Sequence, residues 1–140
     1  MSLSAQVYRR LNTIDIGVGP VTRNDLTGEY YFPSGTTVPS DGFIASEFWI
    51  GNITGVAELR EELRKANIEQ DSLLPNRVLY SGTHSGDVIE LSLLPALEQE
   101  VRRVLVSREM HLSEYLTSVL QGILELIEAA KREDNPIVFV

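Results

Sequence analysis

The pattern of apolar and polar residues is most regular near the end of the chain, where it predicts a long amphipathic helix. Apolar residues recur there every three or four positions, which places them on one helix face: Leu112, Tyr115, Leu116, Val119, Leu120, Ile123, Leu124, Ile127 and Ala130. Ser113 is expected to cap this helix at its start. Residues 134–136, which finish with a proline, are expected to end it. One face of this helix should therefore lie against a core.

A shorter helix is predicted earlier in the chain. Its apolar positions have helical spacing: Leu59, Leu63 and Ala66. Thr54 or Gly55 is expected to cap it, and Glu61 stands four residues before Lys65, a spacing that favours an ion pair on a helix.

A third helix is predicted between these two. Its apolar positions are Leu94, Leu97, Val101, Val104 and Leu105. Ser92 is the expected cap, and Pro95 falls in the first turn, where a missing N–H costs little. Glu98 stands four residues before Arg102, so a second ion pair is expected.

Strands are predicted where β-branched and aromatic residues alternate or cluster between turn residues. The predicted strands are 7–18, 27–32, 77–80, 88–91 and 137–140. The apolar and aromatic segment 43–49 is ambiguous between helix and strand. Four apolar residues at 137–140 would be a liability if they were unpaired, so we expect them to insert beside another strand.

Helices that are grouped with a sheet, rather than strictly alternating with strands, are typical of the α+β class. The 140 residues, 43% of them hydrophobic, match the size and composition of one globular domain. We therefore expect a single α+β domain over residues 1–140. In it, a small and mostly antiparallel sheet packs against two or three helices and includes a C-terminal strand.

Charge and composition narrow the classes of function. Twenty acidic and twelve basic residues give a net charge of −8, which disfavours nucleic-acid binding and favours a basic protein partner, although acidic charge also simply keeps proteins soluble. No cysteine is present, so disulfides and thiolate metal sites are excluded. The first ten residues do not resemble a secretory signal, and no apolar run approaches the roughly 18 residues of a membrane span. A cytoplasmic protein without membrane contact is expected.

The segment 80–87 has the most distinctive chemistry. Two glycines separate its polar side chains, which are the candidate binding residues: Tyr80, Ser81, Thr83, His84, Ser85 and Asp87. A structural turn, in which His84 fixes the loop by hydrogen bonds, is the leading interpretation. Contact with a partner comes second, and acid–base catalysis by His84 and Asp87 comes third.

No known catalytic motif supports the third interpretation. The Gly-x-Ser-x-Gly pattern of hydrolases and the His-Glu-x-x-His pattern of zinc enzymes are both absent. Gly17 and Gly19 lack the third glycine and the following helix of a dinucleotide fingerprint. We therefore predict no enzymatic activity, no metal and no cofactor.

The preferred candidate for a contact surface is the loop 27–42. It contains Tyr30 and Tyr31, which we include among the binding candidates, and loops carry function on rigid scaffolds. Phe48 and Trp49 follow this loop and are typical both of core residues and of interface anchors. The sequence leaves that choice open.

Residues 78–87, the two following helices and the closing residues 135–139 together resemble small bacterial immunity-type proteins. The resemblance covers about the last 65 residues. It implies an inhibitor that neutralises a basic, nuclease-like toxin by direct binding and without catalysis of its own. Two alternatives stay open: a small enzyme that uses His84 and Asp87, and a protein that self-associates through 137–140, as in a homodimer.

Overall fold

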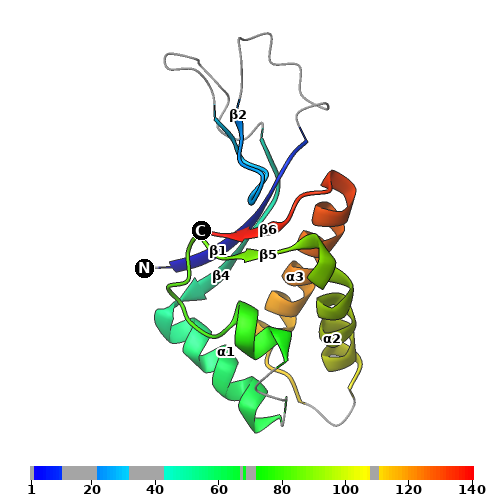
Figure 1. The fold of residues 1–140 in the computed structure, drawn as a ribbon. Coiled ribbons are helices and arrows are strands. Elements are labelled where there is room, and N and C mark those ends of the chain that lie inside the picture. Colours follow the sequence, from blue (N-terminus) through cyan, green and yellow to red (C-terminus); the bar gives the residue numbers. More distant parts are fainter. Residues whose placement is uncertain (1, 11–21, 32–42, 67, 69–71, 108–110) are drawn as a thin grey trace.

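The computed structural model describes residues 2–10, 22–31, 43–66, 68, 72–107 and 111–140. A four-stranded antiparallel sheet crosses the molecule, and three helices pack together against it (Figure 1). The architecture is the expected α+β domain with a C-terminal strand.

The sheet has the strand order β4-β1-β6-β5. Its strands are β1 (Ser2–Tyr8), β4 (Ile44–Asn52), β5 (Val88–Ile89) and β6 (Ile137–Phe139). A separate two-stranded hairpin is formed by β2 (Thr22–Arg23) and β3 (Tyr30–Tyr31). The prediction that the last residues insert beside another strand is confirmed, since β6 lies between β1 and β5.

The two faces of the sheet differ. Along β1, Leu3, Ala5 and Val7 are buried, whereas Ser4, Gln6 and Tyr8 are only half-buried. Ala5 lines an apolar pocket together with residues of two of the helices, including Leu97 and Ile123. We call the face of Ala5 the inner face and the face of Ser4 the outer face.

The helices are α1 (Ile53–Lys65), α2 (Leu94–Val106) and α3 (Glu114–Glu133). Ser113 caps α3 as predicted, because its Oγ accepts a hydrogen bond from the Leu116 N–H at 3.0 Å. The helix ends where Asp134 adopts a left-handed conformation with φ 52°. The predicted apolar face of α3 is largely buried.

The predicted caps of α1 and α2 are wrong. Asn52 caps α1, since its Oδ1 accepts from the Gly55 N–H at 2.7 Å, so neither Thr54 nor Gly55 has that role. Ser92 does not cap α2, because it lies inside a 3₁₀ turn, η3 (Leu91–Leu93), that runs directly into the helix. The expected place of Pro95 in the first turn is confirmed.

Residues 77–80 do not form a strand. Residues 74–78 instead form a π-helical turn, η2 (Leu74–Val78). The Glu100 carboxylate, which comes from α2, accepts hydrogen bonds from the N–H groups of Leu73 and Leu74 at 2.9 and 2.8 Å. This tertiary cap stabilises the turn, in which Val78 is buried.

Other boundaries shift by smaller amounts. The ambiguous segment 43–49 belongs to β4, the predicted strand 88–91 shortens to β5, and only 30–31 of 27–32 is a described strand. Strand β1 begins at Ser2, before the predicted segment 7–18, of which 11–18 lies outside the described residues.

Of the two predicted ion pairs, one is found. Glu98 and Arg102 lie 3.1 Å apart. Glu61 bonds Arg64, three residues on, where the spacing predicted Lys65. The pKa of Glu61 is lowered chiefly by the hydrogen bond from Arg64. The pKa of Glu98 is lowered chiefly by a hydrogen bond from Lys131 and then by the one from Arg102.

Candidate functional site

The loop 80–87 connects η2 to β5 and is fixed to the sheet by its last two residues. The Gly86 N–H donates to the Phe139 carbonyl at 2.8 Å, and the Phe139 N–H donates to the Asp87 carbonyl at 2.9 Å. Gly86 has φ +97°, a conformation that favours glycine. The loop therefore continues the pairing of β5 along β6.

His84 forms the interior of this loop. Its side chain is only 2% exposed, and its Nε2 lies 2.8 Å from the Val78 carbonyl oxygen. Because a carbonyl only accepts, Nε2 is the donor in this contact. Nδ1 is buried and, among the residues that the structure describes, has no hydrogen-bond partner; an Asp87 carboxylate oxygen lies 3.5 Å away.

Two aromatic rings enclose His84. The Tyr80 ring stacks on it with centroids 4.5 Å apart, and the Phe139 ring lies 4.4 Å away at a tilt of 59°. Tyr80 is the outer of the two rings and is 37% exposed, whereas Phe139 belongs to the core. The histidine thus connects an exposed aromatic ring to the interior of the protein.

Tyr80 is held at three points. Its ring rests on His84, its hydroxyl donates to the Asp87 carboxylate, and its carbonyl accepts from the Arg60 guanidinium. The hydrogen bond to Asp87 is the main reason that the pKa of Tyr80 is raised to about 12, with burial and the charge of Asp87 adding to it. The exposed phenol therefore stays protonated and fixed in one position.

The remaining loop residues make local contacts. The hydroxyls of Ser81 and Thr83 lie 2.9 Å apart, and the Thr83 N–H donates to the Ser81 Oγ at 3.1 Å. Ser85 is exposed. Gly82 is buried, and a Cβ there would lie 2.7 Å from the Ile53 Cα, so only glycine allows this approach to the start of α1. The structural role that the sequence predicted for this turn agrees with these contacts.

The tyrosines of the hairpin lie elsewhere. Tyr31 is 51% exposed and Tyr30 is half-buried. The hairpin packs at the end of β6 where Asn135 lies, since the Arg23 guanidinium donates to the Asn135 side chain at 2.5 Å. The loop 80–87 packs at the opposite end of β6, so the structure does not bring the two candidate surfaces together.

Three residues gain importance only in the structure. Asn135, which the sequence suggested merely as part of a helix stop, is fully buried and donates to the Tyr8 carbonyl at 2.7 Å. Arg60 and Ile53 contact the loop 80–87 from α1, and no sequence motif indicates that contact. Phe48 packs on α3, whereas Trp49 is 59% exposed, which answers the question that the sequence left open.

The site has few ligands for a metal. Within the described ranges, no three histidine or acidic side chains come close enough together to hold an ion. No helix in the described part of the chain has the length and apolar character that crossing a bilayer requires.

Comparison of the chain with family models, with curated proteins and with solved structures finds no match in any of the three. The contacts above are therefore the basis for a functional proposal.

Proposed function

We propose that this protein is a cytoplasmic protein-binding module, an immunity-like inhibitor that neutralises a basic bacterial toxin by direct contact through the loop 80–87. One observation carries the proposal: the exposed Tyr80 side chain is held by His84 at its ring and by Asp87 at its hydroxyl, while its backbone carbonyl accepts a hydrogen bond from α1. Tyrosine, with an apolar ring and a polar end, is among the residues that contribute most at protein interfaces.

Rigidity matters because association usually costs side-chain entropy. A free side chain that becomes ordered at an interface costs about 0.5–1.5 kcal/mol. Tyr80 and Asp87 already restrain each other, and the backbone of the loop is paired with β6. A partner that meets this loop would bind a surface that is already in its bound conformation.

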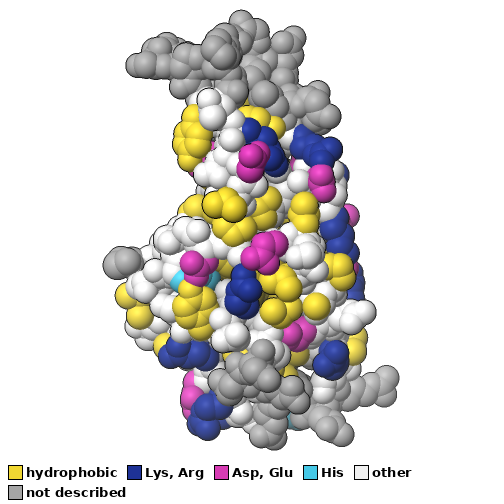
Figure 2. All heavy atoms as spheres, in the orientation of Figure 1, with side chains coloured by type: hydrophobic (Ala, Val, Ile, Leu, Met, Phe, Trp, Pro, Cys, Tyr) yellow, Lys and Arg dark blue, Asp and Glu magenta, His cyan; other side chains and the backbone are white. Residues whose placement is uncertain are grey.

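Charge supports a basic partner. The chain carries a net charge of −8, and Asp87 exposes about half of its side chain beside Tyr80. Figure 2 shows acidic and basic side chains interspersed with hydrophobic ones on the face that includes β5 and β6, rather than one continuous acidic area. Charge of this kind mainly raises the association rate and the specificity of binding.

The two alternatives receive less support from the contacts. A general base needs a nitrogen that faces its substrate, but His84 is buried, with Nε2 bonded to Val78. Self-association through 137–140 needs a free strand edge, but β6 is paired on both sides.

The test is a titration of the purified protein against the product of the gene next to its own, by calorimetry at two salt concentrations. One-to-one binding that weakens with salt and silences the partner's activity is expected. Tyr80→Ala should weaken it by about tenfold or more, whereas Tyr31→Ala, a matched change at the distant hairpin, should have a much smaller effect. If the neighbour does not bind and its toxicity in cells is not relieved, the inhibitor proposal is wrong.

A further inference from the structure

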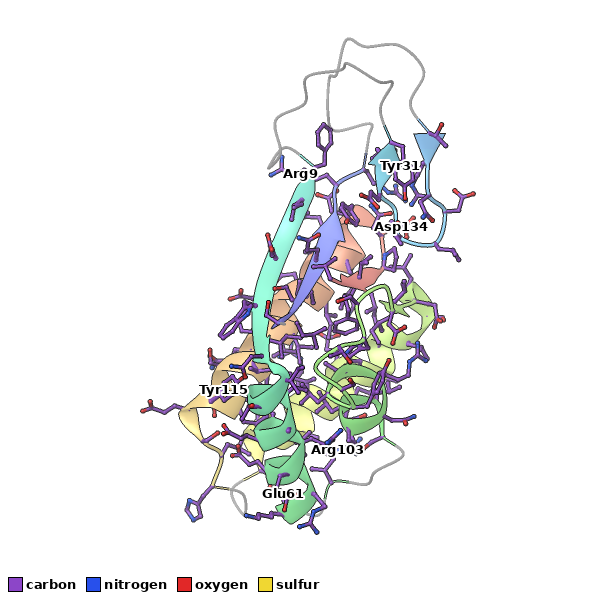
Figure 3. All side chains as sticks on the ribbon, turned by 90° about the vertical axis from the view of Figure 1, so that its left-hand side faces the viewer. Arg9, Tyr31, Glu61, Arg103, Tyr115 and Asp134 are labelled. Atoms are coloured by element: carbon purple, nitrogen blue, oxygen red, sulfur yellow. The ribbon has the colours of Figure 1, made fainter. Side chains whose placement is uncertain are left out.

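The two edge strands of the sheet, β5 and β4, differ in length and in how their outward-facing backbone is bonded. Strand β5 has two residues, and the Arg77 guanidinium donates to its Val88 carbonyl at 3.0 Å. Strand β4 has nine residues, and in the described part of the chain no strand pairs with the edge of β4 that faces away from β1. In Figure 3, β4 runs down the front of the molecule between Arg9 and Tyr115, with no helix in front of it. An open edge of this kind is a template for pairing with another chain.

The register shows which backbone groups of β4 are available. Ser4 exchanges both backbone hydrogen bonds with Val140, at 3.0 and 2.9 Å, so its N–H and C=O point toward β6. On its other side Ser4 stands opposite Trp49. Such a pair is not hydrogen-bonded, so the N–H and C=O of Trp49 point away from the sheet. The N–H and C=O of Glu47 also point away from the sheet, because Glu47 stands opposite Gln6, which pairs with Val138 of β6 on its other side.

The side chains at this edge are an exposed indole and a carboxylate. Cross-strand neighbours share one face, so Trp49, Ser4 and Val140 form a row on the outer face. Trp49 is the most exposed of them, and Val140 is 38% exposed. Glu47 lies on the same face and is also exposed. We call Trp49, Glu47 and the backbone of 46–49 the β4 edge.

Two carboxylates lie close enough to this edge to affect the titration of Tyr8. The pKa of Tyr8, which lies on the same face, is raised by burial and then by the negative charges of Glu29 and Glu47. The nine residues of β4 include no lysine and no proline, the usual residues that block edge pairing. Shifts of register near the two ends of β4 leave 46–49 as its regular stretch. Tyr115 fixes one of these ends by donating to the Ile50 carbonyl at 2.6 Å.

We propose that the β4 edge binds an extended basic segment of a partner protein, which pairs along 46–49 as an added strand. Its arginine or lysine side chains would lie over the Trp49 ring and beside the Glu47 carboxylate, because an indole attracts a cation and a carboxylate pairs with one. This inference rests on the proposed protein-binding function and names the chemistry of the partner. A second copy of this chain fits less well, since each copy has a charge of −8.

The test uses a short peptide of alternating arginine and valine as the probe, with a peptide of alternating glutamate and valine as its control. Trp49 is the single tryptophan of the chain, so its fluorescence reports directly on this edge. The basic peptide should bind, change the Trp49 emission and dissociate as salt rises. Binding that leaves the emission unchanged, or equal binding of the two peptides, would overturn the proposal.

Two variants distinguish binding at the β4 edge from nonspecific electrostatic attraction. Glu47→Lys should weaken peptide binding by about tenfold, since it replaces an attraction with a repulsion. Glu125→Lys, the same change at an exposed position of α3, should leave binding nearly unaltered. Denaturation curves must show that both variants are folded. An equal loss in both variants would indicate nonspecific attraction, and a dimer that Glu47→Lys dissociates would show that a second copy occupies the edge; either result contradicts the proposal.

The same variant distinguishes the two proposals. If the neighbouring gene product binds the wild-type protein and Glu47→Lys equally well, the edge proposal fails and the inhibitor proposal stands. If the neighbour does not bind but the basic peptide does, the inhibitor proposal fails and the edge keeps its specificity for basic segments.

Discussion

At the scale of single residues, the loop 80–87 depends on a histidine whose polar groups are turned inward. The Nε2 of His84 donates to the Val78 carbonyl, and its ring packs between those of Tyr80 and Phe139. A buried side chain of this kind specifies the shape of the loop, because any other conformation would leave the Val78 carbonyl without its donor. Tyr80 and Asp87 are consequently displayed in a fixed geometry.

The bond between Tyr80 and Asp87 predicts an alkaline loss of stability. The pKa of Tyr80 is raised from 10.0 to about 12, chiefly by its hydrogen bond to Asp87. The folded protein thus holds this proton more tightly than the unfolded chain does. The resulting stabilisation is complete below about pH 10 and is lost as the pH rises toward about 12. Asp87→Asn should lower the pKa of Tyr80 and reduce this loss.

Ultraviolet titration of the tyrosines, with Tyr80→Phe to identify the signal, measures the pKa. Urea unfolding on either side of about pH 10 measures the stability. Asp25→Asn, at an exposed carboxylate of the hairpin, serves as the control. Identical titration curves for Asp87→Asn and the wild type would contradict the assignment of the raised pKa to Asp87.

At the scale of elements, the starts of α3 and α2 allow a matched comparison of a serine that caps a helix with one that does not. Ser113 accepts from the Leu116 N–H and donates to the Glu62 carboxylate at 2.7 Å, whereas Ser92 lies in a 3₁₀ turn without a capping bond. Ser113→Ala should lower the free energy of unfolding by about 1–2 kcal/mol, and Ser92→Ala should change it by less than about 0.5 kcal/mol. Urea denaturation compares the two variants directly, and similar losses in both would show that the α2 start is wrongly described.

The contact between α3 and β4 leads to a second prediction at this scale. A Cβ at Gly122 would lie 2.4 Å from the Phe48 ring, so the glycine allows the strand to approach the helix. Gly122→Ala should gain about 1 kcal/mol in helix propensity but lose more through this clash, for a net loss of about 1–2 kcal/mol.

A double-mutant cycle tests that explanation. Phe48→Leu removes most of the ring and should make Gly122→Ala less destabilising, because the two changes share one contact. Additive losses in thermal or urea unfolding would mean that the ring and the helix do not meet as described.

At the scale of the whole molecule, the C-terminal strand holds the sheet together. Strand β6 pairs with β1 on one side and with β5 on the other, and Ile137 and Phe139 are buried in the core. Removal of 137–140 should therefore abolish cooperative unfolding, since losing even two such side chains costs roughly as much as the whole stability of a small domain. Circular dichroism with heating checks this result, and Val140→Ala, at the exposed end of the strand, is the control. A truncated chain that still unfolds cooperatively would contradict the central position of β6.

Much of the fold could be predicted because its signals are local. The period of α3, the Ser113 cap and the Glu98–Arg102 pair each depend on residues within one or two helical turns. The α+β class followed from the order of such elements. One failed prediction, the strand at 77–80, has a different cause: the η2 turn found there depends on Glu100, which lies more than twenty residues away. Local propensity contains no information about such a cap.

The candidate site was likewise only partly predictable from the sequence. Glycine and polar residues were enough to predict that 80–87 is a turn, because glycine conformations and hydroxyl bonds are local. Only the tertiary structure decided that His84 is buried, since its partners Val78 and Phe139 come from different elements. Exposure of Trp49 was equally undetermined, because an aromatic residue in a strand suits either face until the neighbouring strands and helices are placed.

The sequence by itself thus determined the helices, the C-terminal strand and the polar turn, all of which arise from side chains close together in the chain. The tertiary structure decided the central place of β6, the burial of His84 and the position of β4 at one edge of the sheet. These features depend on contacts between segments far apart in the chain. Their free energy comes from burial and pairing that exist only once the sheet and helices have packed.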